Sequence, residues 1–89
     1  MRERDLEKHL VEKVRSLGGR AYKWSSPAHR GVPDRLVILP GGRVLAVEVK
    51  RSSGKATRLQ QRELAALNGL GVKALVVDSI KAVEELFGE

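Results

Sequence analysis

The chain has 89 residues, of which 42% are apolar and 31% charged, and its net charge is +6. A chain this short encloses one hydrophobic core, so we expect a single domain over residues 1–89. Cysteine is absent and histidine occurs only twice, which excludes disulfides and thiolate zinc sites and leaves oxygen ligands for any metal. No apolar run approaches the ~20 residues needed to cross a bilayer, so we expect a cytoplasmic protein, nucleoid-associated if bacterial, with no membrane partner.

The positive charge is concentrated in the middle of the sequence. Between Lys13 and Arg62 there are twelve lysines and arginines but only two acids, Asp34 and Glu48. The other nine acids lie outside this segment. A basic protein favours an anionic partner, for which nucleic acid is the commonest explanation. Asp34 and Glu48 are therefore isolated carboxylates in a basic field.

The first predicted element is an amphipathic helix over Glu3–Leu17, because four apolar residues recur there at helical spacing: Leu6, Leu10, Val14 and Leu17. The pair of glycines at 18–19 then ends the pattern. A short strand is predicted over Arg20–Trp24. The segment that follows, SSPAHRGVP, has the composition of a basic, irregular loop.

The remaining sequence predicts a hairpin followed by a crossover. The β-rich runs Asp34–Leu39 and Arg43–Lys50 are separated by Pro-Gly-Gly, which is typical of a hairpin turn. Thr57 can cap a helix that runs to about Asn68. A fourth strand over Lys73–Val77 and a last helix, capped by Ser79 and ending near Phe87, complete the chain. The order α-β-β-β-α-β-α predicts an α/β fold with a mixed sheet of about four strands flanked by helices.

The register of the hairpin decides whether the isolated acids meet. If Leu39 pairs with Arg43 across a three-residue turn, Asp34 falls opposite Glu48, with Cβ atoms within about 5.5 Å. Lys50 shares a face with Glu48, because side chains alternate along a strand. A two-residue Gly-Gly turn would shift the pairing by one and disperse the three groups. The simpler alternative is that these are exposed strand charges paired with nearby bases.

Two carboxylates with oxygen-only ligation suit Mg²⁺ or Mn²⁺, which keep several waters and accept phosphate oxygens in the remaining positions. Lys50 beside such a metal would orient a bound water or stabilise the negative charge of a transition state. The three side chains together therefore predict hydrolysis of a phosphodiester.

The residues Pro33-Asp34 and Glu48-Val49-Lys50 resemble the motif of the PD-(D/E)xK nuclease superfamily, whose core is restriction-endonuclease-like. The segment Gly31-Val32-Pro33-Asp34, the Glu-x-Lys strand and Gln60 are more narrowly similar to the VRR-NUC family, in particular to its stand-alone phage or bacterial members. The resemblance covers essentially the whole chain. It implies that Asp34, Glu48 and the backbone carbonyl of Val49 bind the metal, that Lys50 assists the nucleophile, and that Gln60 faces the active site.

The resemblance also implies a carboxylate on the first helix. Glu7 is preferred, as a catalytic group and possible metal ligand, because its spacing to Leu10, Val14 and Gly18 resembles that of archaeal junction resolvases. Glu3 is the rival, since it lies closer to the centre of the apolar stripe. Arg58 stands where the family often has proline, two residues before Gln60.

The leading hypothesis is a DNA endonuclease that selects branched or four-way junction DNA in replication or repair. The resemblance implies a homodimer, and two symmetric sites would suit a two-fold symmetric junction. Alternatives are a non-catalytic basic DNA-binding module and a sequence-specific restriction-type nuclease. Phosphate contacts are expected from seven basic residues that flank the motif: His29, Arg30, Arg35, Arg51, Lys55, Arg58 and Arg62.

Overall fold

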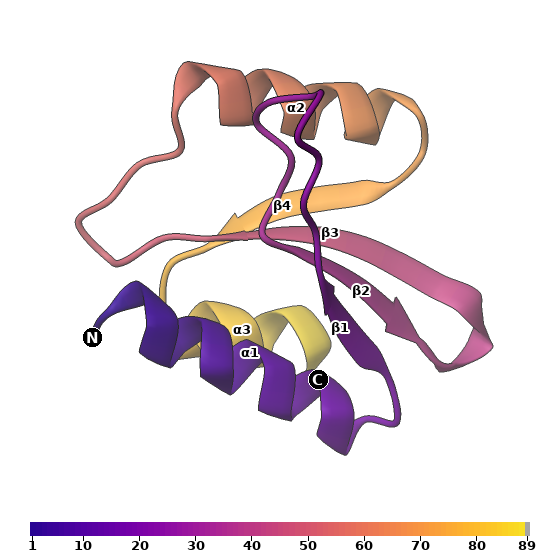
Figure 1. Cartoon of the computed structure of the whole chain (residues 1–89). Helices are drawn as coiled ribbons and strands as arrows, with labels where there is room; N and C mark the ends of the chain where they lie inside the picture. The colour runs from indigo at the N-terminus through magenta and orange to yellow at the C-terminus, as the bar shows by residue number, and fades with distance from the viewer. Residues whose placement is uncertain (89) are drawn as a thin grey trace.

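The computed structural model describes residues 1–88 and contains a four-stranded sheet between two layers of helix (Figure 1). The elements in chain order are α1 (Glu3–Ser16), β1 (Arg20–Lys23), β2 (Arg35–Leu39), a 3-10 turn η1 (Pro40–Gly42), β3 (Arg43–Val49), α2 (Arg58–Gly69), β4 (Lys73–Val77) and α3 (Ile80–Phe87). The predicted order is therefore confirmed. None of the helices within residues 1–88 is both long enough and apolar enough to span a membrane.

The strands lie in the order β1-β2-β3-β4, with β1, β2 and β3 antiparallel and β4 parallel to β3. The parallel pair follows from the crossover through α2, which returns the chain to the same end of the sheet. Lys50 and Asp78 consequently follow two neighbouring strand ends at one edge of the molecule.

The larger core lies between the sheet and the layer formed by α1 and α3. Helix α1 buries Leu6, Leu10 and Val14, which recur every fourth residue and so form one stripe. They pack on alternate strand residues that are also buried: Val37, Leu39, Leu45, Val47, Val49 and Val77. The side chain of Glu84 on α3 ties this layer together, because its two oxygens lie 2.9 Å from Lys13 Nζ and 2.8 Å from His9 Nε2.

Helix α2 covers the other face of the sheet, as Figure 1 shows. Here the core is small: Leu64 of α2 packs against Ala46 and Ala74 of the strands. Glu48 lies two residues after Ala46, so strand alternation places it on this same face, between the sheet and the beginning of α2. The local sequence therefore buries a carboxylate where an apolar residue would be expected.

The hairpin between β2 and β3 has the three-residue turn that favours the site. Leu39 pairs with Arg43 and Arg35 pairs with Val47. Gly41 and Gly42 have φ angles of 84° and 79°, which side chains with a Cβ rarely adopt, so the two glycines set this turn and its register. Asp34 lies one residue before β2, at the position that continues the pairing toward Glu48.

Candidate active site

Asp34 and Glu48 are held at the edge of the sheet by backbone contacts as well as by register. Asp34 precedes β2, where its carbonyl accepts a hydrogen bond from Trp24 N at 3.0 Å. Its Oδ2 accepts a hydrogen bond from Val49 N at 2.8 Å, which ties the side chain to the strand that carries Glu48. The predicted convergence of the two carboxylates is thus present.

Glu48 is the single buried charged residue among residues 1–88, with 2% of its surface exposed. Its Oε2 accepts a hydrogen bond from Gln60 Nε2 at 2.9 Å and lies 3.4 Å from Lys50 Nζ. Its Oε1 is buried too, and no donor within residues 1–88 hydrogen-bonds to it. A buried carboxylate oxygen without a partner is costly, so this atom points to a ligand that supplies positive charge.

The electrostatics of Glu48 agree with its burial. Desolvation raises the pKa of Glu48 from its usual 4.5 to about 7, and the negative charge of Asp34 raises it further, whereas Lys50 opposes the shift. The charge of Glu3 also raises this pKa. Three carboxylates therefore act on one small region, which is an arrangement that a cation relieves.

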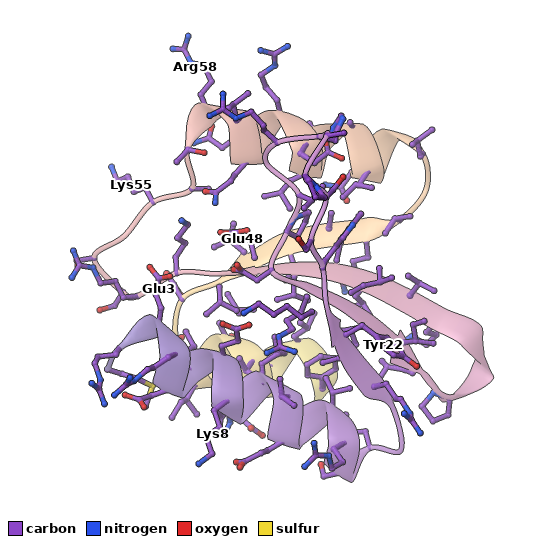
Figure 2. The ribbon with its side chains drawn as sticks, viewed as in Figure 1. Glu3, Lys8, Tyr22, Glu48, Lys55 and Arg58 are labelled. Atoms are coloured by element: carbon purple, nitrogen blue, oxygen red, sulfur yellow. The ribbon has the colours of Figure 1, made fainter. Side chains whose placement is uncertain are left out.

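Figure 2 shows Glu48 at the edge of the sheet, with Glu3 at the start of α1 below it and Lys55 on the loop above it. No cluster of three or more His, Cys, Asp or Glu side chains is placed to bind a metal within residues 1–88. Two carboxylates and a backbone carbonyl, as predicted from Asp34, Glu48 and Val49, require no such cluster.

The choice of Glu7 as the helix carboxylate has to be corrected. Glu7 Oε2 lies 2.7 Å from Arg35 Nε, and both side chains are about one-fifth exposed. This ion pair occupies the face of the sheet that packs on α1, whereas Glu48 lies on the face that packs on α2. Glu3, one turn earlier, is the α1 carboxylate whose charge reaches Glu48.

Arg35 is likewise corrected as a phosphate contact. Its Nε is paired with Glu7, and its Nη1 donates a hydrogen bond to the carbonyl of Ala21 at 3.1 Å. These contacts fix β1 and β2 to α1. Of the other predicted phosphate contacts, His29 is exposed but lies 2.6 Å from Glu63. The remaining five are basic and lie around α2 and its preceding loop: Arg30, Arg51, Lys55, Arg58 and Arg62.

Gln60 lies where its spacing predicted, on the side of α2 that faces the sheet. Arg58, at the position where the family often has proline, does not disturb this helix start: Thr57 caps α2, and its side chain accepts a hydrogen bond from Gln60 N. Sequence reasoning identified Thr57 as a cap but missed its connection to Glu48. The signal was present as Thr-x-x-Gln, the spacing of a capping box.

A mixed four-stranded sheet that brings a Pro-Asp loop beside a Glu-x-Lys strand has the architecture of the PD-(D/E)xK superfamily. A phage protein named "Putative nuclease p44", from Acyrthosiphon pisum secondary endosymbiont phage 1, is 53% identical over 79 residues, which cover 89% of this chain and 85% of that protein. A solved structure described as a VRR-NUC domain has a TM-score of 0.90 and 38% identity, covering 94% of this chain and 91% of that one.

A second solved structure, described as a VRR-NUC domain protein, shares the fold with a TM-score of 0.72 at 20% identity, covering 97% of this chain and 84% of that one. No protein-family model matches the chain. The phage protein and the first solved structure both exceed the similarity at which a shared family is secure. The chain belongs to the VRR-NUC family.

Proposed function

We propose that this chain is a DNA nuclease that hydrolyses phosphodiester bonds with a divalent cation, Mg²⁺ or Mn²⁺. The observation that carries the proposal is the buried Glu48 carboxylate, with Oε1 unpaired among residues 1–88 and Asp34 beside it. The similarity to a phage protein named as a nuclease supports the same reaction.

The residues present fit a divalent cation. Asp34, Glu48 and the carbonyl of Val49 offer hard oxygen ligands, which suit Mg²⁺ and Mn²⁺. Asp34 Oδ2 is partly engaged by Val49 N, and Glu48 Oε2 by Gln60, so each carboxylate keeps one further oxygen for a ligand. When bound, the cation would neutralise charge on the phosphoryl group and lower the pKa of a bound water.

Lys50 contributes a positive charge that the protein holds in place. Its ammonium is 16% exposed and lies 3.4 Å from Glu48 Oε2, so it is partly desolvated and restrained. From this position we expect it to orient the attacking water or to stabilise the negative charge that develops on the phosphoryl oxygens. Glu3 takes the place proposed for Glu7, as a carboxylate that approaches the site from the first turn of α1.

The exposed basic residues around α2 would bind the DNA backbone. Figure 2 shows Arg58 directed outward from the start of α2 and Lys55 on the loop between β3 and α2. Such contacts fix the duplex without reading its sequence, and their affinity falls with added salt. This favours a nuclease that selects DNA structure, and we propose branched or four-way junction DNA as its substrate. A homodimer would present two sites to such a two-fold substrate.

The test is cleavage of linear, flapped, forked and four-way DNA in Mg²⁺ or Mn²⁺. We expect the wild type to cut a branched form preferentially, and Asp34→Ala, Glu48→Ala and Lys50→Ala to be inactive while still binding DNA. A fixed recognition sequence at the cut sites would instead establish a restriction-type nuclease. No cleavage of any form, with no divalent-cation affinity, would establish a non-catalytic DNA-binding module.

A further inference from the structure

The first turn of α2 is joined to Glu48 by a continuous chain of hydrogen bonds. Thr57 Oγ1 accepts from Gln60 N at 3.1 Å, and Thr57 N donates to Gln60 Oε1 at 2.8 Å. The same Gln60 side chain donates from Nε2 to Glu48 Oε2 at 2.9 Å. The residue that completes the helix cap is therefore also the residue that contacts the buried carboxylate.

This arrangement fixes the orientation of the Gln60 amide. The Oε1 atom receives the Thr57 N–H, so the Nε2 atom must face Glu48 and can only donate. An amide without that partner could rotate by half a turn and present its oxygen to the carboxylate, which would repel it. The cap thus makes Gln60 an obligatory donor to Glu48.

A fixed donor on Oε2 also decides which oxygen of Glu48 faces a ligand. Gln60 and Lys50 both approach Oε2, while Oε1 stays without a donor among residues 1–88. Rotation of the Glu48 carboxylate would exchange the two oxygens and lose both contacts. The partners of a metal-binding carboxylate commonly set its orientation in this way.

We propose that Thr57 is a positioning residue for the active site, acting through Gln60 to hold Glu48 with Oε1 available to a divalent cation. The inference rests on the proposed function, because it takes Glu48 as a cation ligand. It makes the helix cap and the cation site one cooperative unit, so that a cap mutation weakens cation binding as well as stability.

The test compares two helix caps in the full chain. Ser79 caps α3, where its hydroxyl accepts from Ala82 N at 3.0 Å, and no printed contact joins it to Glu48. Thr57→Ala and Ser79→Ala should each lower Tm by roughly 4–8 °C, since each removes one cap. The Kd for Mn²⁺, measured by titration calorimetry without DNA, should rise about 10-fold in Thr57→Ala. It should stay at the wild-type value in Ser79→Ala, and Thr57→Ser should restore it.

Thr57→Gly provides a second variant, because glycine is tolerated at a helix N-cap but has no hydroxyl. It should fold and show the same rise in Kd. Equal Kd values for Mn²⁺ in the wild type, Thr57→Ala and Thr57→Gly would overturn the inference, as would equal weakening by Ser79→Ala. If the wild type binds Mn²⁺ and Asp34→Asn does not, such a result leaves the proposed function intact. A wild type without Mn²⁺ affinity would instead reject the proposed function.

Discussion

Replacing Glu48 with glutamine should stabilise the cation-free protein at neutral and higher pH. Glutamine has nearly the same shape, and its carbonyl oxygen can accept from Gln60 and Lys50 as Oε2 does. It removes the buried negative charge that Asp34 repels. The wild-type residue therefore lowers stability in exchange for its charge, as functional sites commonly do.

The size and sign follow from the pKa of Glu48, which folding raises from 4.5 to about 7. The folded state binds this proton more tightly than the unfolded chain, so the stability contributed by the group is complete below pH 4.5. That stability is lost as the pH rises through 7. A shift of about 2.5 units corresponds to roughly 3 kcal/mol. Glu48→Gln lacks this titration, and its advantage over the wild type should grow by that amount between pH 4.5 and pH 8.

The assay is denaturant unfolding of both proteins from pH 4.5 to 8 in EDTA, so that no divalent cation contributes. Added Mg²⁺ or Mn²⁺ should then stabilise the wild type at pH 8 and leave Glu48→Gln unchanged, because binding to the native state raises stability. Parallel stability profiles for the two proteins across this pH range would refute the reasoning, since they would mean that folding does not perturb Glu48.

Three further changes test other parts of the site and fold. Glu3→Gln should weaken Mn²⁺ binding in calorimetry with little change in Tm, whereas Glu7→Gln should cost about 1–2 kcal/mol of stability in denaturant unfolding and leave the Mn²⁺ affinity unchanged; the reverse pattern would restore Glu7 to the site. Arg58→Ala and Arg62→Ala should each reduce the slope of log K for DNA against log salt by about 1, and unchanged slopes would remove them from the interface. Glu84→Gln should lower stability near pH 7 and match the wild type at pH well below 4.5, because hydrogen bonds from Lys13 and His9 hold the pKa of Glu84 below its usual value; a pH-independent difference would contradict this.

Local signals in the sequence were sufficient for the fold and for the centre of the site. The spacing of Leu6, Leu10 and Val14 identified the buried stripe of α1, and the Pro-Gly-Gly turn identified the hairpin. Once that turn was taken as three residues, strand alternation alone put Asp34 opposite Glu48. These features follow from short-range rules of backbone geometry, which a single sequence records.

The failures concern side chains whose partners are distant in sequence. Glu7 and Arg35 are 28 residues apart, and each looked available because the sequence does not show that the other is opposite it. Glu63 similarly engages His29 across 34 residues. Periodicity places a residue on a face of its own element, but the angle at which α1 crosses the sheet decides which of its acids reaches Glu48.

Cleavage of four-way DNA by Asp34→Asn, measured beside the wild type, tests the central claim most directly. Asparagine retains an oxygen to accept from Val49 N, so the fold is kept while the charge beside Glu48 is lost. We predict that the wild type cleaves in Mg²⁺ or Mn²⁺ and not in EDTA, and that Asp34→Asn is at least about 100-fold slower with unchanged DNA affinity. Cleavage by Asp34→Asn at the wild-type rate, or by either protein in EDTA, would contradict the account.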